Sequence, residues 1–188
     1  MSQPRETIRD KNPYKRGADD GLIMGGLLIV VFLVSVFAVE SGFIALIAGL
    51  LMFVAVPVTT FIMLKRSNDR DNGCTLFSSL WVQGIVLFFC GTLILAMFQY
   101  LYFRFIAPTY VADVFNAAAQ AYDEIGTKEA QDISFMLHRV VETHSLPSPI
   151  ELAVMTLWGG IFTGSILSAI LGGIVKFTYR FQSKSKQA

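Results

Sequence analysis

The sequence predicts an all-α integral membrane protein with four transmembrane helices and a short extracytoplasmic amphipathic helical segment between the third and the fourth. Hydrophobic residues make up 54% of the 188 residues and charged residues only 15%, whereas soluble domains carry about 25% charged residues. The apolar residues come in blocks that are too long for a soluble core. Lys and Arg also concentrate in alternate connections between these blocks, as they do in multi-pass proteins.

The first span is expected at residues 21–39, after a polar cytoplasmic segment of residues 1–20. We expect Asn12-Pro13 to break any early helix in that segment. Residues 21–39 are apolar and long enough to cross a hydrocarbon core of about 30 Å. The segment before them is long and contains acidic residues, unlike the start of a signal peptide, so we expect an uncleaved span.

The second span is expected at residues 43–64, and its connector to the first is short enough to predict a tight antiparallel hairpin. Pro57 lies inside this span and is a candidate hinge. Proline leaves one helical carbonyl without a partner, and Thr59 or Thr60 could donate to it.

A charged turn at residues 65–74 separates the second span from the third, residues 76–103, which ends in an interfacial cluster of aromatic side chains. Residues 107–149 form the extracytoplasmic segment. Apolar residues recur at helical spacing in both halves of it, with Gly126 between. We therefore expect two short amphipathic helices, which either lie on the membrane or cap the bundle.

The fourth span is expected at residues 150–177, followed by a cytoplasmic tail of residues 178–188. Small residues recur at every fourth position in this span and at the start of the first, which lets helices approach closely in lipid. The helix-packing residues are Gly17, Gly21, Gly25, Gly160, Gly164, Ser168 and Gly172. We favour packing of the last span against the first over use of this face by a partner helix or for self-association.

The distribution of positive charge predicts the orientation of the chain. Twelve of the fifteen Lys and Arg residues lie before the first span, in the turn after the second or near the end of the chain. Positive connections stay cytoplasmic, so both termini are expected inside and residues 107–149 outside. The net charge of +1 provides no basic surface for nucleic acid.

No Asp, Glu, Lys, Arg or His falls in the middle of a predicted span, which argues against coupled transport and against catalysis within the bilayer. Polar residues in the spans, such as Gln83 and Thr92, are better explained by interhelical hydrogen bonds. Cys74 lies in a charged turn and Cys90 in an apolar run, so both are expected to be free thiols.

Two groups of side chains are weak candidates for a cation site. The first is a set of carboxylates on the cytoplasmic side: Asp19, Asp20, Asp69 and Asp71. We favour a simpler explanation, in which they face a helix N-terminus or stay solvated. The second group is His138, Glu142 and His144, of which only the first two share a helical face. We therefore predict no metal, no cofactor, no catalytic residue and no enzymatic activity.

Two stretches carry a resemblance to a known family. They are residues 12–26, NPYKRGADDGLIMGG, and residues 105–108, FIAP, at the exit from the third span. With the four-span pattern, the chain resembles the bacterial membrane family called domain of unknown function 4199, from about Asn12 to Lys176. The resemblance implies a four-helix inner (cytoplasmic) membrane protein with no established activity. Members of this family tend to be encoded near a lipid-phosphate glycosyltransferase, so the resemblance also implies, by association, a role in envelope biogenesis.

Two functions remain open from the sequence. The first is a non-catalytic accessory or scaffolding protein that contacts membrane lipids and an envelope glycosyltransferase, or that self-associates. The alternative is a small lipid or solute transporter, in which Pro57 is a hinge and Asp19 and Asp20 take part.

Overall fold

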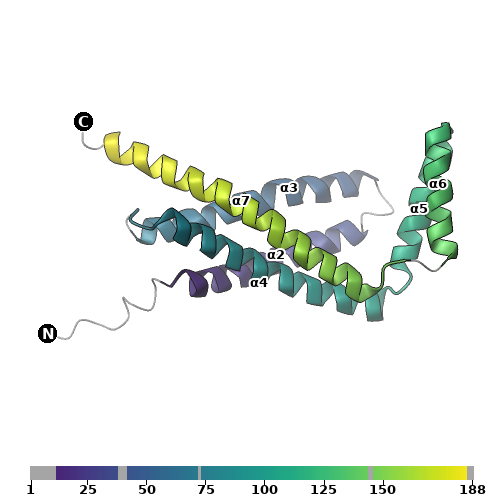
Figure 1. Cartoon of the computed structure of the whole chain (residues 1–188), viewed down its shortest axis with the longest axis horizontal. Coiled ribbons are helices and arrows are strands. Elements are labelled where there is room, and N and C mark those ends of the chain that lie inside the picture. The colour runs from purple at the N-terminus through teal and green to yellow at the C-terminus, as the bar shows by residue number, and fades with distance from the viewer. Residues whose placement is uncertain (1–11, 38–41, 72, 144–145, 186–188) are drawn as a thin grey trace. The chain divides into compact units, whose positions relative to one another are not determined.

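A computed structural model of the chain describes residues 12–37, 42–71, 73–143 and 146–185, all of which are helical or in turns and loops, with no β-strand (Figure 1). It divides into two compact units. Unit 1 comprises Met1–Leu95 with Thr156–Ala188, and unit 2 comprises Ala96–Met155.

Helix α2 runs from Pro13 to Phe37 and so begins before the expected first span. Asn12 and Pro13 lie at the start of this helix, and the polar segment before them lies outside the described residues. The side chain of Asn12 accepts a hydrogen bond of 3.0 Å from the backbone N–H of Tyr14, as an N-cap does. Proline is well suited to the first helical position, where its missing N–H costs nothing.

Helix α3, Gly42–Arg70, contains Pro57 and continues through the first half of the expected charged turn. Thr60 is fully buried and donates 2.8 Å to the carbonyl of Val56, which is not the carbonyl that Pro57 leaves free, that of Phe53. The connector between α2 and α3 at residues 38–41 lies outside the described residues.

Helix α4, Phe77–Leu101, ends in a π-helical turn, η1, Tyr102–Ile106. Helix α7, Pro149–Ser185, is the longest described element. It starts with a capping box, in which Ser148 N–H donates 2.7 Å to the Glu151 carboxylate and Glu151 N–H donates 3.4 Å to the Ser148 hydroxyl.

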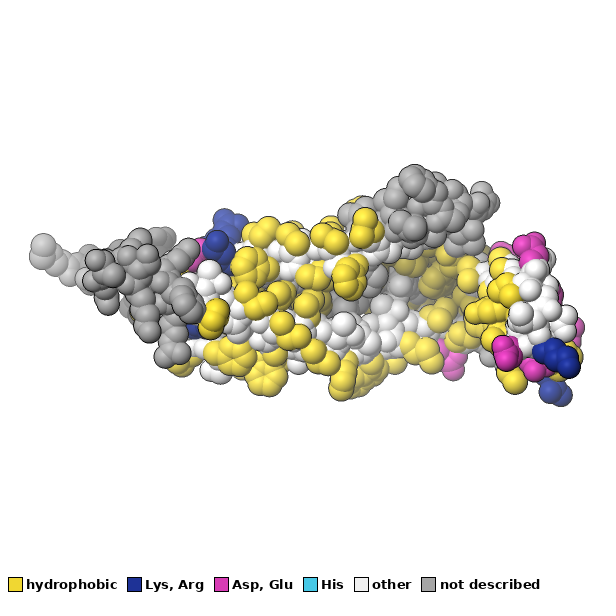
Figure 2. All heavy atoms as spheres, turned by 90° about the horizontal axis from the view of Figure 1, so that it is seen from above, with side chains coloured by type: hydrophobic (Ala, Val, Ile, Leu, Met, Phe, Trp, Pro, Cys, Tyr) yellow, Lys and Arg dark blue, Asp and Glu magenta, His cyan; other side chains and the backbone are white. Residues whose placement is uncertain are grey.

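Three described helices are long and apolar enough to cross a membrane: Pro13–Phe37, Phe77–Ile106 and Pro149–Tyr179. Their exposed side chains are largely apolar, and Figure 2 shows apolar side chains spread over the face of unit 1 that it presents. Large exposed apolar surfaces of this kind mark contact with lipid or protein. The chain therefore has the character of a multi-pass membrane protein.

Both rows of small residues in unit 1 pack against α4. A Cβ atom added at Gly21 of α2 would lie 2.6 Å from Cβ of Cys90. On α7, a Cβ added at Gly164 would overlap the ring of Phe88. The last helix was expected to use this face against the first span. In the structure each helix instead uses its small face against α4, which contributes both large side chains and its own Gly84 and Gly91 to these contacts.

The core of unit 1 forms along the same contacts. One apolar cluster contains Met24, Leu28, Val56, Leu87, Phe88 and Leu95. A second cluster, nearer the end of α3, contains Leu64, Leu80 and Val175. Together they join α2, α3, α4 and α7, so unit 1 is a bundle of four helices.

Unit 2 contains a helical hairpin of α5, Tyr110–Ile125, and α6, Lys128–Glu142. Gly126 ends α5 with a φ of 71°, and the Thr127 side chain caps α6 by accepting from Ala130 N–H. Small residues lie buried in this unit: Ala119, Ala130 and Ser134. The ring of Tyr110 stacks on Phe103, and burial raises the pKa of its hydroxyl above the ordinary value.

Candidate functional site

The most polar region of unit 1 lies where α2 begins and α3 ends. Arg16 of α2 donates two hydrogen bonds to the carboxylate of Asp71, at 2.8 Å and 3.1 Å. Both side chains are mostly buried, with 12% and 21% exposed. Thr75 donates a further bond of 3.0 Å to the same carboxylate. Paired, forked contacts of this kind combine charge with defined geometry.

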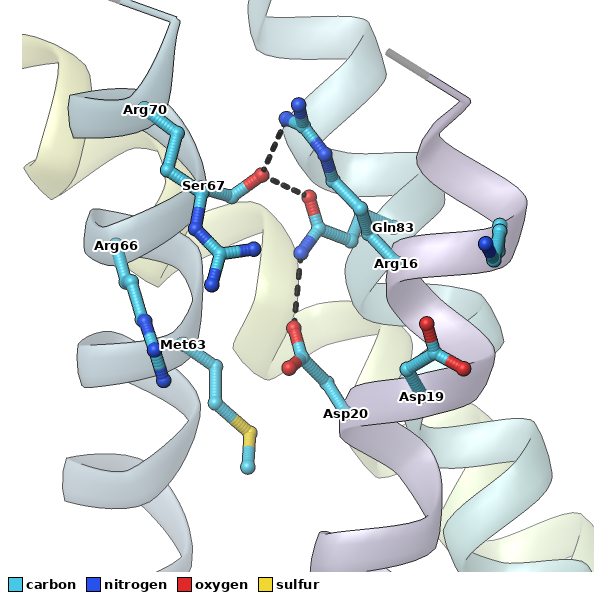
Figure 3. Close-up of a pocket in the computed structure, with 9 residues that line it drawn as sticks. Arg16, Asp19, Asp20, Met63, Arg66, Ser67, Arg70 and Gln83 are labelled. Carbon is cyan, nitrogen blue, oxygen red and sulfur yellow. Dashed lines mark hydrogen bonds between the residues drawn. The ribbon is translucent and has the colours of Figure 1, made fainter. Parts of the chain in front are cut away.

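A chain of hydrogen bonds continues from Arg16 across three helices (Figure 3). Arg16 also donates 3.1 Å to the hydroxyl of Ser67, which donates 2.7 Å to the Gln83 side-chain oxygen. The Gln83 amide then donates 3.1 Å to the Asp20 carboxylate. Ser67 and Gln83 are 4% and 1% exposed. Gln83 thus makes the interhelical hydrogen bonds expected from the sequence and joins α2, α3 and α4. The same expectation for Thr92 was wrong, because its hydroxyl donates 2.6 Å to the carbonyl of Phe88 within α4.

A cavity of about 70 Å³ opens beside this chain of hydrogen bonds. Its lining includes the cations Lys15, Arg66 and Arg70, together with Asp19 and Asp20. In Figure 3 the Arg70 guanidinium extends into the space between α3 and α2. The described ion pairs of the chain do not include Arg66 or Arg70. Arg66 and Arg70 therefore have no direct ion-pair contact among the described residues, although both interact electrostatically with the Asp20 carboxylate in the same cavity.

Two further hollows adjoin the end of α3. An open depression is lined by Ile62, Lys65, Arg66, Asp69 and Arg70. A small cavity of about 20 Å³ is lined in part by Asn68 and Tyr179. Asn68 is fully buried, and neither its amide oxygen nor its amide nitrogen has a hydrogen-bond partner among the described residues. The small cavity has room for one water molecule, which could serve both amide atoms.

The four candidate carboxylates take different positions. Asp71 is paired with Arg16, and Asp20 accepts from Gln83. Asp19 lines the 70 Å³ cavity, whereas Asp69 lines the other two hollows. No group of three or more Asp, Glu, His or Cys side chains suited to a metal occurs in the part of the chain that is described.

The structure also shows where most of the remaining candidate residues lie: the histidines, the proline of α3 and the two cysteines. His138 lies 3.6 Å from the carboxylate of Asp123 instead of joining a ligand set, and His144 lies outside the described residues. Pro57 is half-buried within α3. No disulfide joins Cys74 and Cys90, as expected.

Sequence reasoning missed Arg16, Ser67, Arg66 and Arg70 as members of one site. It treated residues 65–74 as a turn, but α3 continues to Arg70. Residues at 63, 66, 67 and 70 then recur at intervals of three and four, which places them on one helical face. The signal was available as that spacing in residues 63–70, which contain neither proline nor glycine.

These features define a multi-pass helical membrane protein with a polar cluster at one end of its bundle. The family described as "Protein of unknown function (DUF4199)" matches residues 19–176. The chain belongs to this family, as its sequence resemblance indicated. No curated protein matches the chain, and no solved structure does.

Proposed function

We propose that the chain is a non-catalytic accessory or scaffolding protein of the bacterial inner membrane. It crosses the bilayer four times with both termini in the cytoplasm, and it serves the biogenesis of envelope lipids or glycans. The partner is an envelope glycosyltransferase, which contacts the α5–α6 hairpin.

The length and surface of α3 support it as the fourth crossing. It has 29 residues, enough to span the hydrocarbon core at about 1.5 Å per residue. Its exposed side chains include Phe53, at 81%, and Ile62, at 56%. A helix with such side chains exposed is stable only beside lipid or another protein.

The positive-inside rule supports the orientation, and a labelling experiment tests it. Ser134 is buried, so the outer label belongs at an exposed position such as Gln120. In a background without Cys74 and Cys90, Gln120→Cys should react with an impermeant thiol reagent in intact spheroplasts. Asp69→Cys should react only after permeabilisation. The reverse pattern would overturn the orientation.

The observation that carries the scaffolding role is the exposed apolar surface of the α5–α6 hairpin. Several large side chains are exposed on these helices: Tyr122, Ile125, Ile133, Phe135 and Met136. The same helices also carry six acidic residues outside this set, Asp113, Asp123, Glu124, Glu129, Asp132 and Glu142. Anionic lipid would repel such a hairpin, which favours a protein partner for its apolar side chains.

Photo-crosslinking in living cells tests this role. A photo-crosslinking amino acid at Met136, which is 66% exposed, should yield one protein adduct of defined mass. The same amino acid at Gln131, an exposed polar position on α6, is the matched control and should yield little. Mass spectrometry of the Met136 adduct should identify an envelope glycosyltransferase. Adducts with lipid alone would contradict the scaffolding role.

A small lipid or solute transporter is the second candidate, and the 70 Å³ cavity between α2, α3 and α4 favours it. Pro57 then acts as a hinge in α3, and Asp19 and Asp20 contact the solute. Reconstituted vesicles test this alternative. Pro57→Ala should slow transport at least several-fold, while transport that is absent or unchanged would exclude it.

A further inference from the structure

We propose that Arg66 and Arg70 form a binding site for a phosphate group, at the cavity between the end of α3 and the start of α2. The phosphate belongs either to a lipid headgroup or to a free solute. The site goes beyond the scaffolding role, and it does not depend on whether the α5–α6 hairpin has a partner.

The two guanidinium groups make no direct hydrogen bond or ion pair with a described residue, and their interaction with the Asp20 carboxylate is electrostatic at longer range. Asp71 accepts from Arg16 and Thr75, and one oxygen of Asp20 accepts from Gln83. No described hydrogen bond or ion pair involves Arg66 or Arg70. Arg66 and Arg70 lie one turn apart on α3, and both side chains line the cavity. This spacing lets two guanidinium groups approach one ligand.

The size and charge of the cavity suit a phosphate group. About 70 Å³ can hold several water molecules, and a compact tetrahedral anion can take their place. Lys15, Arg66 and Arg70 outnumber Asp19 and Asp20 in the lining, once the Arg16–Asp71 pair is set aside. Guanidinium groups bind phosphate through paired N–H donors, which makes arginine the most suitable side chain for this task.

The same two arginines also line the open depression beside Lys65 and Ile62. Ile62 is 56% exposed, so this depression joins an apolar surface to a cationic one. A lipid could place its phosphate at the arginines and an acyl chain along α3. Cationic residues next to a spanning helix are a recognised means of holding anionic lipids.

Ligand-dependent thermal unfolding of the full chain in neutral detergent tests the site. One arm adds inorganic phosphate, with chloride at equal ionic strength as control. The other arm adds short-chain phosphatidylglycerol, with phosphatidylcholine of the same chain length as control. The variants are Arg66→Gln/Arg70→Gln, Arg70→Lys and, as the matched control on the same helix, Lys65→Gln. Lys65 lines the depression but not the 70 Å³ cavity.

We expect the double variant to bind the phosphate-bearing ligand at least roughly ten-fold more weakly, because each charge-assisted hydrogen bond contributes about that factor. Arg70→Lys should lie between the double variant and the unaltered chain, and Lys65→Gln should change the affinity for inorganic phosphate less than about two-fold. If both ligands stabilise the chain, a free phosphate is sufficient for binding. If only phosphatidylglycerol does so, the site recognises the phosphate of a lipid headgroup.

Two results would overturn the proposal. One is that neither ligand stabilises the unaltered chain. The other is that Lys65→Gln weakens the binding of inorganic phosphate as much as the double variant does, since diffuse surface charge would then account for that binding. Helical circular dichroism of each variant without ligand distinguishes loss of binding from loss of fold. If the double variant unfolds, the comparison of Arg70→Lys with Lys65→Gln still decides the outcome.

Discussion

The Arg16 guanidinium and the Asp71 carboxylate form two hydrogen bonds between residues 55 positions apart in the sequence. They connect the first turn of α2 to the turn that follows α3. Because Arg16 also binds Ser67, the pair positions the donors and acceptors that reach Gln83 and Asp20. The ion pair therefore determines how α2, α3 and α4 meet at this end of unit 1.

Removal of one partner of this ion pair is expected to destabilise the bundle. Asp71→Ala leaves the Arg16 guanidinium mostly buried without its carboxylate, at a cost of about 2 kcal/mol. Thermal unfolding in detergent measures the loss. The charge exchange Arg16→Asp/Asp71→Arg should recover part of it, and a double variant as unstable as the sum of the single variants would show that the pair contributes nothing.

The contact between α2 and α4 is tested at Gly21. A Cβ there would lie 2.6 Å from Cβ of Cys90 and 2.9 Å from the Leu87 carbonyl oxygen, so Gly21→Ala forces the helices apart. We expect a loss of about 1–3 kcal/mol. Gly26→Ala, on the same helix with open space around it, is the control and should be neutral or stabilising by up to about 1 kcal/mol. Equal effects at both positions would refute this packing.

The contact between α7 and α4 is tested at Gly164, where a Cβ would overlap the Phe88 ring. Gly164→Leu should lower the thermal stability by more than about 3 kcal/mol, because neither α7 nor Phe88 can move without separating the helices. Gly173 lies on the same helix, and no described atom of another helix lies within 4 Å of the position that its Cβ would take. Gly173→Leu is therefore the control and should leave the free energy of unfolding almost unchanged. A similar loss in both variants would indicate an effect on membrane insertion instead.

The turn after α3 is tested at Gly73, which has a φ of 75°. Its Cβ position overlaps the Tyr179 ring, whereas Gly126, with a φ of 71°, has open space around it. Gly126→Ala should cost only the strain of a left-handed residue, about 1–2 kcal/mol. Gly73→Ala should cost more in the same thermal unfolding measurement. If Gly126→Ala is the more harmful, the contact with Tyr179 is not important.

Most of the helical architecture could be predicted from the sequence, because long apolar blocks and helical periodicity have few alternative structures in lipid. The third apolar block lies within α4–η1 except for its first residue, the fourth lies within α7, and Gly126 separates two short helices. The helix ends were harder to predict. Pro13 begins a helix, and Arg70 ends one inside a highly charged segment, since a local cap or a tertiary ion pair decides both positions.

The candidate site could be predicted only in part. Gln83 was recognisable as a polar residue in need of an interhelical partner. Its partners, Ser67 and Asp20, come from separate helices, and no spacing in one sequence relates them. The same limit applies to the small residues, whose periodicity predicts a close approach but does not name the helix that approaches.

The central position of α4 affects how the chain assembles as it is synthesised. Its two neighbours with small faces, α2 and α7, lie on opposite sides of it in the sequence. When α2 leaves the ribosome, the surface that will cover its glycines does not yet exist. That surface appears only after α3 has emerged, and α7 is the last of these helices to be made. The contact between Gly21 and α4 can therefore form before the contact between Gly164 and α4. A chain stalled on the ribosome after α4 but before α7 should then contain the α2–α4 contact alone.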